Sequence, residues 1–210
     1  MSTATGPRKR LSADARREVI ELAASEVFAE RGYHEASIDE IARRSGVSPP
    51  VVYDHFDSKQ DLYKRLLERH QEDLMRLWSD QLEGDEPPEE RIPRALDAWF
   101  EYIEAHPAWL MVFRNAPAEL VDFHRDVLAR SMGTLVPLLA HEPGAENIPG
   151  SGDEDALVMA TELFRSAVAG VALWWYEHRH VPREQAIAVI MNLLWIGFER
   201  LSKGEAWQPD

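Results

Sequence analysis

Apolar residues recur every three or four positions along almost the whole chain, which is the spacing of amphipathic α-helices. The first helix is expected from the Ser12 cap to about residue 31, where Gly32 ends it. Two short helices follow within residues 37–56, and a long one runs from residue 58 to about 82. Five more are expected at about 94–106, 108–116, 118–140, 153–178 and 183–200. The pattern therefore predicts an all-α fold of about nine helices.

The stretch from Ser37 to Lys59 contains several helix start and stop signals at short intervals. Ser37 can cap a first helix, and Glu40, three residues later, completes a capping box. Gly46 can then adopt the left-handed conformation that ends this helix. The first half of the stretch thus predicts a short helix and a tight turn.

The second half of the same stretch predicts another short helix. Ser48 can cap it, and Pro49 and Pro50 occupy first-turn positions whose amides would have no helical partner. Val52 and Phe56 lie four residues apart, so they share one face and pack back onto the first helix. This spacing is that of a helix-turn-helix, whose second helix enters the major groove of DNA.

A larger set of residues around this motif matches one family pattern. The matching residues are Phe28, Gly32, Tyr33, Ile41, Ala42, Gly46, Val47, Ser48, Tyr53, Phe56, Ser58 and Lys59. From about Arg17 to Leu67 the chain resembles the TetR (tetracycline-repressor-like) family of transcriptional regulators. The resemblance implies an N-terminal three-helix DNA-binding domain at residues 1–58 and a larger C-terminal helical domain for ligand binding and dimerisation at residues 59–210. It also implies a homodimeric repressor that a small apolar or aromatic ligand releases from a palindromic operator on double-stranded DNA.

Composition and charge fit a two-part cytoplasmic protein. The net charge is −14, but residues 1–70 hold 12 basic and 12 acidic side chains, so residues 71–210 carry the whole excess. An acidic C-terminal part would repel phosphates and leave the neutral N-terminal part to approach DNA. The absence of cysteine excludes disulfides and thiolate zinc sites. Since no apolar run approaches the roughly 20 residues that span a bilayer, and the N-terminus lacks a signal-peptide core, no membrane association is expected.

The expected DNA-binding residues lie on the second short helix and on either side of it. Tyr53 suits a hydrogen bond to a phosphate, whereas Val51 can make only apolar contacts, for example with a thymine methyl. By the resemblance, Lys59 corresponds to the family's phosphate-binding lysine. A basic arm ahead of the first helix could follow phosphates or enter the minor groove, or it could be a polar tail. The full set is Arg8, Lys9, Arg10, Ser37, Ser48, Pro49, Pro50, Val51, Tyr53, His55 and Lys59.

This helix departs from the family pattern at two places. Pro49 and Pro50 stand where a polar or basic residue followed by a small one is common, and Asp54 places a negative charge near the DNA backbone. Few side chains remain that could form bidentate contacts with bases. DNA shape and thymine methyl groups are therefore expected to carry more of the specificity.

Aromatic residues are concentrated in the predicted fifth to eighth helices. Each one alone fits plain core packing, but for the group the resemblance implies a ligand cavity. The fourth helix is the only element expected to reach both this region and the helix-turn-helix. The expected lining is Trp99, Tyr102, Trp109, Phe113, Phe123 and Phe164. Candidates for its few polar groups are Arg114, His106, His124, Glu162 and Arg165.

The last two predicted helices are apolar around most of their circumference, more than a small domain needs on one side. They could be the two central helices of a monomer. The resemblance instead implies a four-helix bundle across a two-fold axis, and two half-sites on DNA also favour a dimer. The expected interface residues are Ala160, Leu163, Ala167, Gly170, Trp174, Ile190, Leu193 and Gly197.

Other chemistry is weakly represented. His178 and His180 fit a helix C-terminus better than a metal site, and the acids at 153–155 fit a helix start. No glycine-rich phosphate loop or nucleophile–base spacing is visible, so neither an enzyme nor a cofactor is expected. Two alternatives stay open: a ligand-independent DNA-binding or architectural protein with a collapsed core, and a helical ligand-binding or catalytic protein whose helix-turn-helix no longer binds DNA.

Overall fold

The computed structural model describes residues 12–84, 86–142, 144–150 and 154–205, and these ranges contain helices but no strand. The all-α prediction is therefore confirmed. Helix α9, a π-helical turn at Met191–Trp195 and helix α10 follow one another without a break, and together they form the predicted ninth helix. The helices in chain order are α1 (Ala13–Glu35), α2 (Ile38–Ser45), α3 (Pro49–Tyr53), α4 (Lys59–Leu82), α5 (Pro88–Ala105), α6 (Pro107–Arg114), α7 (Val121–Ala140), α8 (Glu154–Glu177), α9 (Arg183–Ile190) and α10 (Ile196–Ser202).

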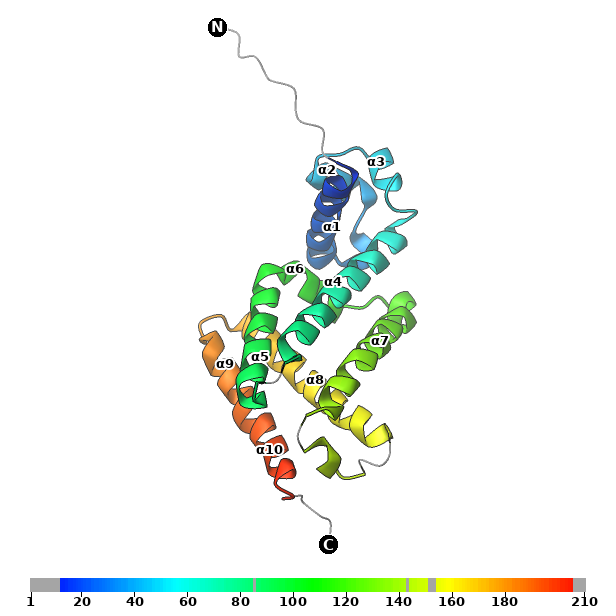
Figure 1. The fold of residues 1–210 in the computed structure, drawn as a ribbon. Helices are drawn as coiled ribbons and strands as arrows, with labels where there is room; N and C mark the ends of the chain where they lie inside the picture. Colours follow the sequence, from blue (N-terminus) through cyan, green and yellow to red (C-terminus); the bar gives the residue numbers. More distant parts are fainter. Residues whose placement is uncertain (1–11, 85, 143, 151–153, 206–210) are drawn as a thin grey trace.

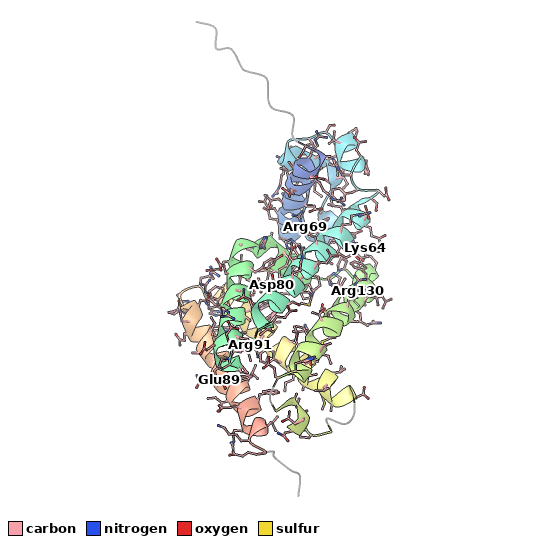
Figure 2. The ribbon with its side chains drawn as sticks, in the orientation of Figure 1. Lys64, Arg69, Asp80, Glu89, Arg91 and Arg130 are labelled. Atoms are coloured by element: carbon pink, nitrogen blue, oxygen red, sulfur yellow. The ribbon has the colours of Figure 1, made fainter. Side chains whose placement is uncertain are left out.

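The helices form an elongated molecule with α1, α2 and α3 at one end (Figure 1). Helix α4 starts beside them and runs toward the middle of the molecule, where it packs against α5 and α7. Lys64, Arg69 and Asp80 mark successive positions along α4 (Figure 2). Helices α8 and α10 lie toward the opposite end, so α4 connects the helix-turn-helix with the rest of the molecule.

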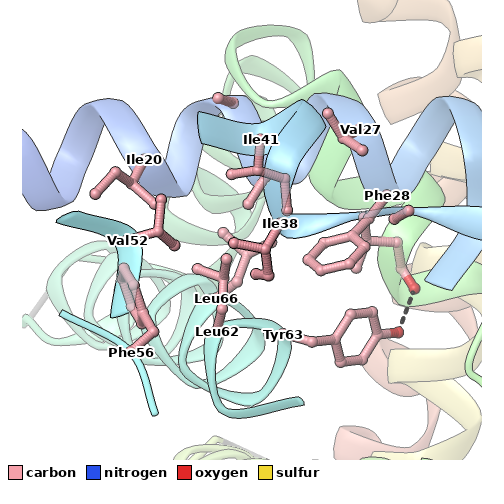
Figure 3. Close-up of a cluster of buried hydrophobic side chains, with 14 of the residues drawn as sticks. Ile20, Val27, Phe28, Ile38, Ile41, Val52, Phe56, Leu62, Tyr63 and Leu66 are labelled. Atoms are coloured by element: carbon pink, nitrogen blue, oxygen red, sulfur yellow. Dashed lines mark hydrogen bonds between the residues drawn. The ribbon is translucent and has the colours of Figure 1, made fainter. Parts of the chain in front are cut away.

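The first core holds the helix-turn-helix together (Figure 3). Ile20 and Phe28 of α1, Ile41 of α2 and Val52 of α3 are buried in it. The first half of α4 closes this core with Leu62, Tyr63, Leu66 and Leu67. Apolar burial stabilises such a cluster by roughly 25 cal/mol per Å² removed from water, so these contacts fix the position of α3.

The second core fills the space between the far half of α4 and helices α5, α6, α8 and α9. Its buried side chains include Leu74 and Trp78 of α4, Phe100 of α5 and Trp175 of α8. Phe100 and Trp175 meet edge to face, with ring centroids 4.9 Å apart. Because α4 contributes to both cores, one uninterrupted helix joins the two parts of the molecule.

Helix α6 is a second link between the two parts. It packs against α1, and its Val112 is buried in the first core, whereas its Trp109 is buried in the second. The prediction that only α4 reaches both parts is therefore wrong. Although α6 is short, it reaches both parts because it lies where the two cores meet.

Most of the predicted helix caps are present. The hydroxyls of Ser12, Ser37 and Ser58 each accept a hydrogen bond from the amide three residues later. Ser48 precedes α3 without a side-chain cap bond. The two prolines that follow it have no amide to donate, and the amide of Val51 donates to the carbonyl of Ser48 at 2.9 Å.

Two local predictions are wrong. The carboxylate of Glu40 does not bond back to the cap residue but accepts from Arg44 at 2.8 Å, so the capping box is only half formed. Helix α5 begins at Pro88 and contains Pro93, whereas the sequence placed its start after Pro93. A proline at the first helical position gives up no helical hydrogen bond. The two acidic residues in the first turn stabilise this helix start, because their negative charges lie near the positive end of the helix dipole.

Helix α8 is long and apolar enough to cross a membrane by length and composition alone. An 18-residue stretch within Asp155–Glu177 has a mean hydropathy of 1.5, although no uninterrupted apolar run in it approaches 20 residues. A search for uninterrupted apolar runs misses it, because Glu162 and Arg165 break the run without lowering the average enough. In the structure α8 packs against α5, α7 and α9, which accounts for its apolar character on one side.

Candidate nucleic-acid interface and ligand cavity

Helix α3 turns one face to the core and the other outward. Val52 and Phe56 are buried and hold this segment in the first core. Tyr53, one residue after Val52, is 54% exposed. Gly46 holds the turn before α3 in the left-handed conformation, with a φ of 71°. The outward face of α3 is therefore accessible to another molecule.

Most of the residues predicted at DNA surround this outward face. Ser37, Ser48, Pro50 and Tyr53 are exposed, and Pro49, Val51, His55 and Lys59 are half-buried. The predicted basic arm of Arg8, Lys9 and Arg10 lies outside the described residues. The structure thus places seven of the predicted residues on α3 or in the segments that flank it, whereas Ser37 caps α2.

Lys59 has a second role that its position in the sequence did not reveal. Its Nζ donates to the carbonyl oxygens of Tyr33, His34 and Ala36 at 2.8, 3.2 and 2.9 Å. Since an ammonium has three protons, these bonds use all of them and tie the start of α4 to the end of α1. A phosphate at the start of α4 would interact with the main-chain amides of that helix terminus and with the positive charge of Lys59.

Two exposed arginines near the turn were not predicted as DNA-binding residues. The side chains of Arg31 and Arg43 are 57% and 73% exposed, at 3.9 and 3.8 Å from the carboxylate of Glu40. Exposed ion pairs at such distances are weak, so both guanidinium groups can turn toward phosphates. Arg44, in contrast, is held by both Glu30 and Glu40. Basic residues flanking the motif were the available signal in the sequence.

A cavity of about 400 Å³ lies between the far half of α4 and helices α5, α6, α7, α8 and α10. Its walls are mostly apolar. Four residues of the predicted ligand site line it, namely Trp99, Trp109, Phe113 and Phe164. Further lining residues that were not predicted include Leu74, Trp78, Leu135 and Trp195. The spacing of Leu74 and Trp78, four residues apart on α4, was the signal that could have identified them.

Tyr102 and Phe123 lie outside the cavity wall, which corrects the prediction for both. The Tyr102 hydroxyl is 2.6 Å from Nδ1 of His70, and its ring stacks on His106 with centroids 4.2 Å apart. Phe123 packs against the first core, where its ring centre lies 5.1 Å from Nζ of Lys64. Helical spacing placed both rings on inward faces but could not distinguish core from cavity.

We expect His70 to make the stability of this region depend on pH. Burial lowers the pKa of His70 to about 3, and the neighbouring His106 adds to the effect. An unfolded histidine has a pKa of about 6.5, so on acidification the unfolded chain takes up the proton first. The contribution of neutral His70 to the free energy of unfolding is therefore complete above about pH 6.5 and is lost as the pH falls toward 3. Measured by urea titration, the free energy of unfolding should be roughly 2–3 kcal/mol lower at about pH 4.5 than at about pH 7 because of this residue.

The matched variants for this measurement are His70→Gln and His34→Gln. His34 is an exposed histidine, so His34→Gln is the control for replacing an imidazole at the surface. His70→Gln removes the buried titrating group and should flatten the curve. An unchanged pH dependence in His70→Gln would contradict the assignment.

A polar contact joins the two cores at their border. The Tyr63 hydroxyl donates to the carbonyl of Val112 at 3.2 Å (Figure 3). The same hydroxyl lies 3.1 Å from Nε2 of His124. Burial raises the pKa of Tyr63 and lowers that of His124, so both are neutral near pH 7. Helices α4, α6 and α7 are thereby held together where the DNA-binding part meets the rest.

Charged groups at the cavity wall are paired. Glu142 accepts from Arg91 at 3.0 Å, and both side chains are about nine-tenths buried. Arg91, at the start of α5 (Figure 2), also donates to the carbonyl of Glu86 at 2.7 Å. Arg165 donates to Glu162 at 2.7 Å. Among the described lining residues, neither charged side chain is left uncompensated.

Only one of the polar residues predicted for the ligand site, Arg165, reaches the cavity. Gln71 and Ser131 line it without having been predicted, and Gln71 donates to the Ser131 hydroxyl at 2.5 Å. The remaining predicted polar residues lie elsewhere: Arg114, His106, His124 and Glu162. The cavity is consequently less polar than the sequence suggested.

One face of α8 and of the last helix is both apolar and exposed. Leu163 is 66% and Leu193 is 74% exposed, and Trp174 is half exposed. Ala160, Leu163, Leu193 and Gly197 also line the cavity, so the cavity extends to this face. We call this surface the α8–α10 face; its members are Met159, Leu163, Ala167, Gly170, Trp174, Val189, Leu193, Ile196 and Gly197.

Ile190 is the exception among the predicted interface residues. It is almost completely buried in the second core, so its assignment to an exposed interface is wrong. Val189 takes its place on the α8–α10 face. Since one residue turns an α-helix by about 100°, an error of a single position moves a side chain from surface to core.

His178 makes a local contact. Its Nδ1 is 2.7 Å from the carbonyl of Trp174, and its ring stacks on that tryptophan. Across the described ranges, no group of three or more His, Cys, Asp or Glu side chains could hold a metal ion. Asp153, one of the acids at the start of α8, lies outside those ranges.

Comparison with known proteins agrees with this geometry. The family model of bacterial regulatory proteins of the tetR family matches residues 20–66, from α1 into α4. Over 196 residues the chain is 30% identical to the HTH-type transcriptional activator FasR of Mycolicibacterium smegmatis, covering 91% of this chain and 87% of that protein. The chain belongs to the TetR family. As a TetR family member it is a DNA-binding transcriptional regulator with a helix-turn-helix.

Solved structures of transcriptional regulators have the same fold along most of the chain. A TetR-like regulator from Rhodococcus sp. RHA1 superposes with a TM-score of 0.71 at 24% identity, covering 90% of this chain and 99% of that one. FadR from Bacillus subtilis, in complex with stearoyl-CoA, superposes with a TM-score of 0.68 at 18% identity, covering 89% and 98%. At these identities the likeness concerns the fold, and it extends well beyond the helix-turn-helix.

Proposed function

We propose that this TetR family regulator is a cytoplasmic homodimeric repressor that binds a palindromic operator and releases it when a small, largely apolar ligand occupies the cavity. Residues 1–58 would form the DNA-binding domain and residues 59–210 the regulatory and dimerisation domain. One observation carries the proposal: α4 is buried in the helix-turn-helix core at one end and lines the cavity at the other.

The cavity supports an apolar ligand. Its volume of about 400 Å³ lies within the range of small-molecule sites, and a collapsed core would leave no such space. This argues against the alternative of a ligand-independent regulator. The stearoyl-CoA complex of FadR concerns that protein, but it supports the idea that this fold can enclose a long apolar chain.

The α8–α10 face supports the dimer. Leu163 and Leu193 are strongly exposed and both border the cavity, and such exposed apolar side chains favour a protein interface. The small residues Ala167 and Gly170 would let a helix of the second copy approach closely. A dimer would also present two recognition helices to two half-sites.

Selection from random DNA followed by ligand titration tests the proposal. We expect palindromes whose half-site centres are about 34 Å apart, and a loss of affinity when an apolar ligand is added. Enrichment of no sequence would favour the alternative of a ligand-binding protein with a non-functional helix-turn-helix. Binding that strengthens with ligand would favour activation, the role in the name of the similar regulator FasR.

Substitutions on α3 should separate general from sequence-specific contacts. Tyr53→Phe removes one hydroxyl and should weaken all DNA binding by about fivefold, the value of one hydrogen bond. Lys59→Ala should weaken all sequences and lower the salt slope by about 1. Val51→Ala should change sequence preference more than general affinity. Fluorescence anisotropy at several salt concentrations measures all three effects.

Two controls accompany this series. Tyr176→Phe removes a hydroxyl from α8, away from α3, and should leave DNA binding unchanged. Because Lys59 also ties α4 to α1, thermal unfolding must show that Lys59→Ala is folded at the assay temperature. Wild-type operator affinity in both Tyr53→Phe and Lys59→Ala would refute the proposed interface.

A further inference from the structure

The cavity wall contains buried hydrogen-bond donors without protein acceptors. In the described part of the chain, three buried side-chain polar atoms lack a protein partner, and all are indole nitrogens, Nε1 of Trp99, Trp109 and Trp195. Each of these tryptophans is more than nine-tenths buried, and each lines the cavity. The buried Trp175 does not line it, and its Nε1 donates to the carbonyl of Val181 at 3.0 Å.

An explanation is needed because such donors are normally paired. Leaving a buried N–H without an acceptor is unfavourable, and buried tryptophans usually find a partner. Three tryptophans with unpaired indole N–H groups line the same cavity, which indicates that the molecule bound there supplies the hydrogen-bond acceptors. We propose that the ligand is an apolar molecule carrying oxygen acceptors, in the form of carbonyl or carboxylate groups, and that the indole N–H groups donate to them. The inference rests on the proposed role of the cavity as the ligand site.

The positions of the indoles suggest where the acceptors lie. Trp99 of α5 and Trp109 of α6 are neighbours, with ring centroids 6.1 Å apart and planes at 86°. An acceptor beside this pair could receive a bond from either ring. Trp195 lies on the π-helical turn and packs against Phe198. Single π turns are frequent at functional sites, and here the turn carries the third tryptophan that lines the cavity.

The charges of the wall argue against a cationic ligand. Glu142 is paired with Arg91, and Arg165 is paired with Glu162, so neither carboxylate is uncompensated. An ammonium could bind to aromatic faces, but it would leave the indole donors unpaired. An oxygen acceptor would satisfy them after a small rotation of the indole rings, because the three nitrogens have almost no accessible surface in this structure. A site with buried donors also discriminates strongly against analogues that lack the acceptor.

A panel of probes on one scaffold tests the inference. The probes are 4-phenylbutan-2-one, 4-phenylbutanoate, 4-phenylbutylammonium and butylbenzene, which share a phenyl ring and a four-carbon chain. Affinities are measured by calorimetry on the full-length wild-type protein and on Trp99→Phe, Trp109→Phe and Trp175→Phe. The quantity compared is the affinity ratio of ketone to butylbenzene, since effects of cavity volume largely cancel in this ratio. The carboxylate arm distinguishes a charged from a neutral acceptor.

We expect the ratio to fall by about fivefold in Trp99→Phe or Trp109→Phe and to stay unchanged in Trp175→Phe. In nitrogen-15 spectra of the wild type, the ketone should shift the indole N–H resonances of Trp99 or Trp109 downfield, whereas butylbenzene should not. Unshifted resonances together with equal ratios in all variants would overturn the inference, and would fit N–H groups that already point at a neighbouring ring. Preferential binding of the ammonium probe would overturn it as well. Binding of none of the four probes would also refute the cavity as the ligand site, which separates the two failures.

Discussion

The Met159→Glu variant is expected to be a monomer that no longer binds its operator tightly. Met159 is 67% exposed, and it begins a stripe on α8 that continues through Leu163, Ala167, Gly170 and Trp174 at helical spacing. In the proposed dimer this stripe is covered by the second copy. A glutamate there would be buried without a partner in both copies, which costs several kcal/mol. Loss of the second half-site contact should then weaken operator binding by about 100-fold or more.

Analytical ultracentrifugation and operator titration at the same protein concentration measure this prediction. Met159 is a better test position than Leu193, because Leu193 also lines the cavity and its replacement would disturb the ligand. Leu22→Glu is the matched control, since Leu22 is 63% exposed on α1, away from the α8–α10 face. It should remain dimeric. A wild-type protein that is monomeric at micromolar concentration would refute the proposed interface directly.

The helix-turn-helix was predictable because its signals are local. Caps, a left-handed glycine and apolar residues four positions apart act within a few residues, and the structure shows Ser37, Gly46 and Val52 in these roles. Where the structure adds to the prediction or departs from it, a side chain has a partner that the local pattern did not indicate. Lys59 bonds to carbonyls at the end of α1, and Glu40 is drawn to Arg44 instead of the helix start.

The cavity was only partly predictable because it depends on how several helices meet. Periodicity shows that Trp99 and Tyr102 both belong to an inward-facing region, but only the packing of α4 and α6 decides which one lines a space. Tyr102 turns to His70, whereas Trp99 faces the cavity. The π turn at 191–195 shifts the following residues relative to a regular helix, so the position of Trp195 could not be read from a period of 3.6.

Helix α6 changes the expected route between ligand and DNA. Its Trp109 and Phe113 line the cavity, while Val112 between them is buried in the first core. The carbonyl of Val112 also accepts from Tyr63 of α4. Pressure on the two aromatic rings would therefore reach the DNA-binding part through one short helix, together with α4. A tilt of either helix would change the separation of the two recognition helices in a dimer.

We expect a ligand in the cavity and the operator to weaken each other by the same factor. Linkage requires this reciprocity, and coupling of this kind is typically about 5–150-fold. Calorimetric titration of the tightest phenylbutyl probe into free protein and into the protein–operator complex measures how far the operator weakens probe binding. Operator titration with and without saturating probe measures how far the probe weakens operator binding.

The Tyr63→Phe variant tests the route. It removes the hydrogen bond to the carbonyl of Val112 and the contact with His124 but keeps the ring in the first core. We expect probe affinity in the free protein to stay close to wild type, because Tyr63 does not line the cavity, while the coupling factor falls several-fold. Tyr176→Phe, on α8, should keep the full coupling. Equal probe affinities for free and operator-bound wild type would mean that occupancy of the cavity does not release DNA, since a ligand shifts an equilibrium only by its differential affinity for the two states.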